Sequence, residues 1–169
     1  GDDFIKSSPE PKLRENWITN IKGFRKCTRC KACQFRLNKT EYLTPFSDKP
    51  SKIKGNFNCK TEYAICVLEC PGNLCYVGNT KLQVHKRILQ HTRAIVNKDI
   101  NYPVARHFLQ AHDSNTRGLK YFVIDGIPYN KRGGDRESLL RRVESKYIIK
   151  LNTKTPYGLN IEEDLYTHL

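Results

Sequence analysis

Three closely spaced cysteines, with two residues between neighbours in the run C-T-R-C-K-A-C, restrict how this chain can fold more than any other feature. Short turns of this kind let Cys27, Cys30 and Cys33 converge on one tetrahedral zinc ion. Cys59, in N-F-N-C-K, is the natural fourth ligand, with Cys66 or water as alternatives. The seven cysteines are an odd number, and no signal-peptide pattern is seen, which argues against a secreted disulfide framework. The pattern predicts a structural zinc site; free or redox-active thiols are the alternative.

Positive charge dominates the composition, with a formal net charge of +13. Lys and Arg displace condensed counterions from phosphates, so this balance predicts a nucleic-acid partner. The alternative is a basic protein with no polyanion partner. No apolar run approaches the roughly 18 residues of a membrane-spanning helix, so we expect no membrane span.

The chain divides into three parts by composition. Residues 1–22 contain Ser-Ser-Pro-Glu-Pro and are expected to be a leader or linker. Residues 23–60 form a cysteine-rich, zinc-binding segment, with loop chemistry in T-P-F-S-D-K-P-S-K at 44–52. Residues 61–169 have the pattern of a compact domain.

The compact part has clear signals for regular structure. The apolar run E-Y-A-I-C-V-L-E-C, the turn P-G-N and the run L-C-Y-V-G predict a β-hairpin. We expect Gly78 to let the chain leave the second strand and turn directly into a helix. The remaining expected elements are helices at 81–96 and 103–112, a strand at 119–127, a helix at 133–151 capped by Asp135, and a turn at 155–160. The order predicts an α/β (α+β) fold: a small three-stranded mixed or antiparallel sheet flanked by helices, with the zinc-binding segment appended.

Charged side chains fall at informative positions on two of these helices. Arg87 and His91 are four residues apart and share one helix face. Glu144 lies three or four residues from several apolar positions, which puts it on or at the edge of the buried stripe. A buried carboxylate needs a cation, a metal or hydrogen bonds. Alternatively, Glu144 extends to solvent or pairs with Arg141 or Arg142.

A second set of metal-ligating residues is spread more widely. Cys70 and Cys75 precede the first helix, and His107 and His112 follow it. Two cysteines and two histidines can complete a tetrahedral zinc site. The spacing leaves open the alternative of two core thiols and two surface histidines.

An ordered set of short motifs resembles a known family. Tyr76-Val77-Gly78, then Arg87, then Glu144 on a later helix and finally Asn160 resemble the GIY-YIG endonuclease domain. The chain is more closely similar to the endonuclease of Penelope-like retroelements, which follows a reverse transcriptase in one polypeptide. The resemblance covers about residues 23–162. It is carried by CPGNLCYVGNT, KRILQH, VARHF, GGD, ESKYIIKLNT and PYGLN, together with the upstream C-T-R-C-K-A-C and N-C-K-T.

The resemblance implies a nuclease that cuts DNA with one Mg²⁺ or Mn²⁺ ion. Tyr76 would lie beside the scissile phosphate, and Arg87 would bind and neutralise that phosphate. Glu144 would ligate the metal ion, and His91 would take a proton from water or touch the phosphate. Asn160 would help to hold the site. A nuclear location, a target DNA that is nicked for insertion, a reverse-transcriptase partner and possibly element RNA follow from the same likeness.

Two positions depart from the family pattern. The first motif should end in a tyrosine about ten residues before Tyr76, where this chain has Cys66; either Tyr63 serves instead or that tyrosine is absent. A cysteine usual in the zinc site that the subfamily carries inside the domain is replaced by Gly72, which leaves Cys75 as the substitute ligand. The departure at Cys66 keeps a second function open: a catalytically inactive, zinc-stabilised DNA- or RNA-binding module that targets a fused reverse transcriptase.

Overall fold

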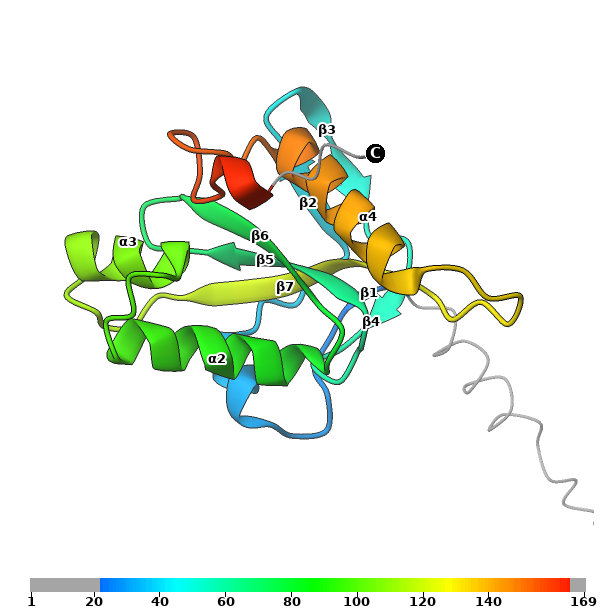
Figure 1. Ribbon diagram of the computed structural model, residues 1–169, viewed down its shortest axis with the longest axis horizontal. Coiled ribbons are helices and arrows are strands. Elements are labelled where there is room, and N and C mark those ends of the chain that lie inside the picture. The colour runs from blue at the N-terminus through cyan, green and yellow to red at the C-terminus, as the bar shows by residue number, and fades with distance from the viewer. Residues whose placement is uncertain (1–21, 165–169) are drawn as a thin grey trace, which may run out of the picture.

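The computed structural model describes residues 22–164 (Figure 1). All but the last residue of the expected leader, 1–22, lie outside the described residues. No helix of the described part is long and apolar enough to cross a membrane.

A three-stranded antiparallel sheet forms the centre of the fold. The expected hairpin is present as β5 (Ala64–Glu69) and β6 (Cys75–Thr80), and β7 (Lys120–Gly126) pairs with the other side of β5. Because β5 is central, its side chains are buried on both faces, which explains its continuous apolar run. Residues directly opposite in an antiparallel pair share a face, and Cys66 stands opposite Gly78.

Three helices pack around this sheet in the order that the sequence predicts (Figure 1). They are α2 (Val84–Val96), α3 (Pro103–Ala111) and α4 (Arg136–Leu151). Proline begins α3, where its missing N–H costs nothing. Asp135 caps α4 as expected, since its carboxylate accepts a hydrogen bond from the Ser138 N–H at 3.0 Å.

The cysteine-rich segment contains short regular elements of its own. Two two-stranded sheets and a 3₁₀ helix make it up. They are β1 (Gly23–Phe24) paired in parallel with β4 (Asn56–Phe57), β2 (Glu41–Thr44) paired antiparallel with β3 (Ser47–Lys52), and η1 (Lys31–Phe35).

The expectation of a loop at 44–52 is wrong for most of that stretch. Thr44 pairs with Ser47 around a two-residue turn, and β3 then follows. The strand S-D-K-P-S-K has no apolar residue, so composition alone indicates a loop. Backbone pairing with β2 makes it a strand, and Pro50 is tolerated because this strand lies at an edge.

One apolar core joins the cysteine-rich segment to the sheet. The rings of Phe24 and Tyr121 lie 5.5 Å apart between centroids, and the Leu37 N–H donates to the carbonyl of Tyr121 at 2.9 Å. These contacts dock the segment against β7. The cysteines are therefore fixed relative to the sheet and its helices.

Candidate active site and metal centre

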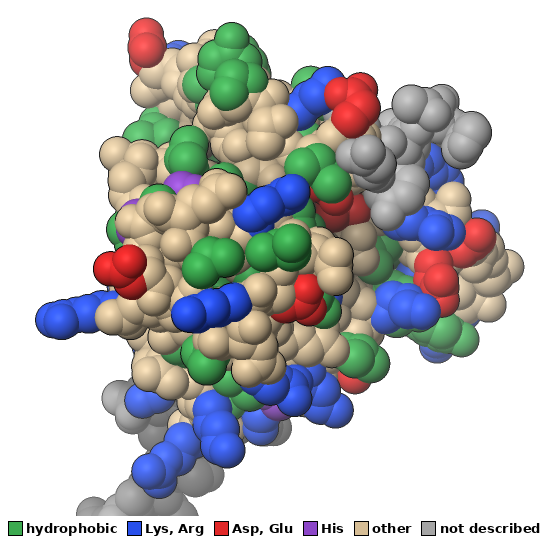
Figure 2. Space-filling model, turned by 60° about the vertical axis from the view of Figure 1, so that its left-hand side comes forward, with side chains coloured by type: hydrophobic (Ala, Val, Ile, Leu, Met, Phe, Trp, Pro, Cys, Tyr) green, Lys and Arg blue, Asp and Glu red, His purple; other side chains and the backbone are tan. Residues whose placement is uncertain are grey.

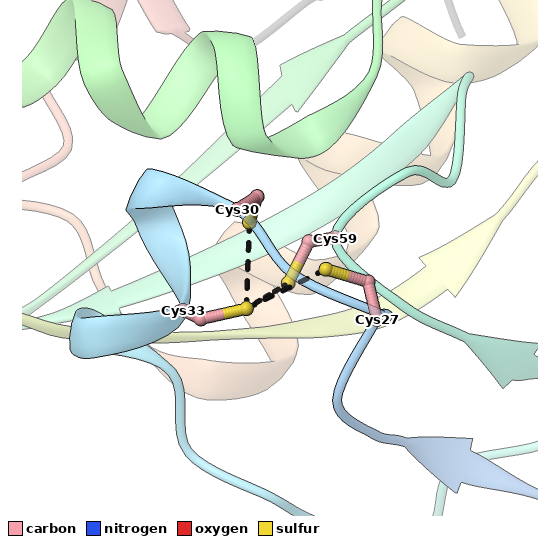
Figure 3. Close-up of side chains that lie close together, drawn as sticks. All are labelled: Cys27, Cys30, Cys33 and Cys59. Atoms are coloured by element: carbon pink, nitrogen blue, oxygen red, sulfur yellow. Dashed lines mark hydrogen bonds between the residues drawn. The ribbon is translucent and has the colours of Figure 1, made fainter.

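Four cysteines, two buried and two half-buried, converge between η1 and the start of α2 (Figure 3). The Cys33 thiol lies 3.4 Å from the sulfurs of Cys27 and Cys30 and 3.8 Å from that of Cys59. All four sulfurs lie within 4.8 Å of one another. Tetrahedral zinc with bonds of about 2.3 Å separates its sulfur ligands by roughly 3.8 Å. These four cysteines, including Cys59 as the predicted fourth ligand, could therefore hold a zinc ion.

The surroundings of this cluster suit thiolate ligands that are held in place. The Tyr121 hydroxyl donates to the Cys59 sulfur at 3.1 Å, which orients that ligand. Burial, followed by the neighbouring Cys33 thiol, raises the pKa of Cys30, so a cation is needed before all four sulfurs ionise. The donor set and its geometry fit a structural site with no open position.

The second predicted zinc set is brought together only in part. The Nε2 atoms of His107 and His112 lie 3.2 Å apart, on α3 and just beyond it. Cys70 and Cys75 lie close enough that the Cys75 charge raises the pKa of Cys70, although burial is the larger cause. Within residues 22–164, only the four-cysteine cluster gathers three or more possible metal ligands within 4.8 Å of one another.

Tyr76, His91 and Arg87 come together where β6 meets α2; Tyr76 and His91 are buried, and Arg87 is half-buried. The Tyr76 and His91 rings meet edge to face at 5.7 Å, and Tyr102 contacts the other side of His91 at 5.9 Å. His91 is 1% exposed, and neither ring nitrogen has a hydrogen-bond partner among the described residues. The buried Nε of Arg87 also has none, while its Nη1 donates to Gln90 at 3.1 Å. Burial, and then the Arg87 charge, lowers the pKa of His91 to about 3, so its imidazole is neutral.

Glu144 is buried, as its helical spacing predicts, with 4% of its surface exposed. Asn79 donates to its Oε2 at 2.5 Å. Burial raises the pKa of Glu144 to about 7; the Asn79 hydrogen bond opposes this shift, the Asp164 charge adds to it, and the Arg87 charge opposes it. Neither Arg141 nor Arg142 is therefore needed to account for this carboxylate. A protonation equilibrium near neutrality is typical of functional carboxylates.

Gly78 does not end the strand, contrary to the expectation from the sequence. β6 continues through Gly78 to Thr80, and the turn into α2 follows. The glycine instead makes room, because a Cβ there would stand 3.1 Å from the Cε1 atom of the Tyr76 ring. Its function is to let the Tyr76 ring lie close against the sheet.

The strand register places Cys66, and not Tyr63, opposite Gly78. The Cys66 thiol is fully buried, and burial raises its pKa to about 12, while the Arg87 charge acts against that shift. Tyr63 precedes β5 and stacks beneath the Arg136 guanidinium at 3.7 Å. The side chain opposite Gly78 is thus a protonated thiol and not a phenol.

Asn160 ties the C-terminal turn to the edge of the sheet. Its amide oxygen accepts from the Val77 N–H at 2.9 Å and from the Thr153 hydroxyl at 2.7 Å. Its amide nitrogen donates to the Val77 carbonyl at 2.9 Å and to Asp164 at 3.1 Å. Because Val77 follows Tyr76, this clamp positions the strand that carries Tyr76.

Replacing Asn160 by alanine is expected to destabilise the fold by roughly 3 kcal/mol, since it leaves the buried Val77 N–H and carbonyl unpaired. Chemical denaturation at neutral pH measures this. Asn115→Ala is the matched control, because Asn115 is exposed and its side chain bonds only a nearby backbone N–H. If Asn160→Ala lowered the free energy of unfolding by less than about 1 kcal/mol, as the control should, Asn160 would not be what holds the Val77 backbone.

Two neighbours of the site are not among the predicted residues. Asn79 directly follows the motif Tyr-Val-Gly and binds Glu144, and the ring of Tyr102 closes over His91. Asn79 could be found from its place next to the motif. Tyr102 has no such signal, because it reaches His91 only through the packing of α3 against α2.

Comparison with protein families, curated proteins and solved structures gives no match for this chain. The class that its own structure defines is a mixed α/β protein, with three helices, small sheets and a four-cysteine group able to hold zinc within residues 22–164.

Proposed function

We propose that this chain is a divalent-metal-dependent DNA endonuclease of the GIY-YIG type, most similar to the endonuclease of Penelope-like retroelements. The observation that carries the proposal is the convergence of Tyr76, Arg87, His91 and Glu144 from β6, α2 and α4. The rings of Tyr76 and His91 are in contact, and the Arg87 charge affects the pKa of both His91 and Glu144. A phosphodiester hydrolase needs a cation for the phosphate, a carboxylate for a metal and a group that accepts a proton.

Glu144 would hold the Mg²⁺ or Mn²⁺ ion. It is a hard oxygen ligand with a pKa of about 7, so little free energy is needed to ionise it next to a divalent cation at neutral pH. Mg²⁺ commonly uses one or two carboxylates and completes its shell with water and substrate phosphate. Once bound, the ion would make water more acidic and offset the charge that develops on the phosphate.

Arg87 would bind the scissile phosphate. Its Nε is buried without a partner among the described residues, and one of its terminal nitrogens is already oriented by Gln90. A guanidinium held in this way donates two hydrogen bonds to phosphate oxygens. An anion beside Arg87 would also offset the charge that lowers the pKa of His91.

His91 would accept the proton of the attacking water. Its neutral imidazole has an acceptor nitrogen, and its packing between Tyr76 and Tyr102 fixes the ring plane. A pKa of about 3 makes it a weak base; burial is the larger cause, and a phosphate bound at Arg87 would offset only the smaller contribution of the Arg87 charge. Tyr76 positions the imidazole through the edge-to-face contact.

A plasmid-nicking assay with Mg²⁺ or Mn²⁺ tests this function. Glu144→Gln keeps the shape of the side chain but removes its charge, and we expect nicking to fall by at least about 100-fold. Glu137→Gln is the control on the same helix, because Glu137 is exposed and pairs with Lys81. As a readout separate from activity, Mn²⁺ should raise the melting temperature of the wild type and of Glu137→Gln, but not that of Glu144→Gln.

One observation favours the catalytically inactive alternative: Cys66 stands where the family pattern puts a tyrosine. A wild-type protein that shifts DNA on a gel but leaves supercoiled plasmid intact with every divalent metal would be this zinc-stabilised DNA- or RNA-binding module. That result would overturn the nuclease proposal.

The proposal includes a second structural zinc ion at Cys70, Cys75, His107 and His112. The 3.2 Å separation of the two histidine Nε2 atoms supports it, since roughly this distance separates the ligating nitrogens of two imidazoles on one tetrahedral ion.

The proposal also includes a nuclear location, target DNA as substrate, and action with a fused reverse transcriptase and its element RNA. The net charge of +13 supports a nucleic-acid partner, and Lys and Arg side chains gather at the lower edge of the face in Figure 2.

A further inference from the structure

A hollow of about 340 Å³ lies between the loop that joins β7 to α4 and the first turns of α4. None of Tyr76, Arg87, His91 and Glu144 lines it, so it is separate from the candidate active site. Its volume is at the lower end of the range of about 300–1,000 Å³ for small-ligand pockets. The loop projects from the end of the molecule at which α4 begins (Figure 1). The hollow has room for a group the size of one nucleotide.

The charged side chains around the hollow favour an anion. Three cations line it, Lys131, Arg136 and Arg142, against one carboxylate, that of Asp135. This carboxylate is already occupied, because it caps α4 through the Ser138 N–H. Lys131 and Arg142 are exposed and can turn toward a phosphate.

An aromatic side chain stands beside these cations. Tyr129 is 75% exposed, and its ring centroid lies 6.0 Å from the Arg136 guanidinium carbon. Arg136 is held firmly, since it stacks on Tyr63 and donates from Nε and Nη2 to the Ile127 carbonyl at 3.1 and 2.7 Å. An exposed aromatic ring next to fixed and mobile cations is the combination that binds single-stranded nucleic acid.

A neighbouring hollow of about 430 Å³ shares Ile127, Pro128 and Arg136 with the first but differs in charge. Glu62 and Asp125 line it together with Lys54 and Arg136, so its carboxylates and cations are equal in number. The hollow beside Tyr129 has three cations against one carboxylate, so it is the one that favours an anion.

We propose that the hollow beside Tyr129 holds one nucleotide of a single-stranded DNA segment. The Tyr129 ring stacks on the base, and Lys131 and Arg142 contact the flanking phosphates. A paired base does not offer a free face to such a ring, which is why the occupant is a single strand. The choice of DNA rests on the proposed function, and the site adds to that function a strand-binding position outside the cleavage cluster.

Fluorescence anisotropy with labelled oligo-dT of about 12 nucleotides tests the site, since single-strand sites span roughly 4–16 nucleotides. Tyr129→Ala should weaken binding about 5- to 150-fold, because stacking on an aromatic ring contributes about 1–3 kcal/mol per base. Tyr129→Phe should bind like the wild type. Tyr157→Ala is the control, because Tyr157 is 70% exposed on a different turn and should bind normally. Lys131→Gln and Arg142→Gln should each reduce the steepness of the plot of log binding constant against log salt concentration by about 0.7, the value for one lost phosphate contact on a single strand.

Normal oligo-dT binding by Tyr129→Ala would overturn this site while leaving the nuclease proposal intact, because the plasmid-nicking result does not depend on it. Tighter, Tyr129-dependent binding of oligo-rU than of oligo-dT would assign the hollow to RNA and overturn the choice of DNA. A third outcome is a wild-type protein that does not nick plasmid, with oligo-dT binding lost in Tyr129→Ala but kept in Tyr157→Ala. This result would support the nucleotide site beside Tyr129 and contradict the proposed nuclease function.

Discussion

Treatment with a strong chelator is expected to abolish the cooperative thermal unfolding of this protein, and Cys59→Ser should have the same effect without chelator. Structural zinc sites contribute apparent free energies of about 10–16 kcal/mol, which matches or exceeds the typical total stability of about 5–15 kcal/mol. Cys59 is fully buried, and its sulfur joins the other three cysteines to Tyr121 of the central sheet. Loss of the ion therefore leaves four thiols, two of them buried and two half-buried, without their common partner.

Circular dichroism during heating, with elemental analysis of the same samples, measures this effect. Cys66→Ala is the control, because it removes a buried thiol outside the cluster. It should lower the stability far less than Cys59→Ser does and leave the zinc content unchanged. Adding zinc back should restore the transition in the chelated wild type but not in Cys59→Ser. About one zinc per chain establishes the four-cysteine site, and about two would support the His107 and His112 site as well. A chelated, zinc-free protein with an unchanged melting temperature would rule out a structural zinc.

Acid is expected to remove the contribution of His91 to the stability of the wild type. The pKa of this imidazole is about 3 in the folded protein and near 6.5 when exposed, so the unfolded chain binds the extra proton between these values. The stability contributed by His91 is therefore lost as the pH falls from 6.5 toward 3. Each pKa unit corresponds to about 1.4 kcal/mol, which gives a loss of about 2 kcal/mol between pH 7 and 5 and of about 4–5 kcal/mol near pH 3.

Chemical denaturation of the wild type and of His91→Gln across this pH range isolates the effect. Glutamine keeps a buried polar side chain but does not titrate, so the stability difference between the two proteins should change with pH as described. The contribution of Glu144 to stability has the opposite pH dependence, because its raised pKa of about 7 makes stability fall as the pH rises from 4.5 to 7. Its contribution is present in both proteins and cancels in the comparison. Parallel curves for the two proteins would show that His91 is not held neutral in the interior.

Most of the compact part was predictable because its signals are local. The hairpin of β5 and β6, the three helices and the Asp135 cap follow from apolar spacing, turn residues and capping chemistry within a few positions. The burial of Glu144 follows from helical periodicity in the same way. The polar strand β3 was not predictable, since its only reason to be extended is backbone pairing with β2.

The candidate site was predictable as a set of residues but not as an arrangement. The motif resemblance named Tyr76, Arg87, His91 and Glu144 as candidates, and in the structure the Arg87 charge acts on both His91 and Glu144. The pairing of Asn79 with Glu144 spans 65 positions and has no periodic signal. Nor does any pattern predict that both ring nitrogens of His91 lack a hydrogen-bond partner within residues 22–164.

The spacing of Cys27, Cys30 and Cys33 and the order of the hairpin and helices are properties of the chain alone, because the residues involved are neighbours in sequence. Folding in three dimensions decided the rest. A strand's side chains alternate between faces, so register alone put Cys66, and not Tyr63, opposite Gly78. Asn160 reaches Val77 across 83 positions for a similar reason: the edge of β6 needs hydrogen-bond partners that its own hairpin cannot supply.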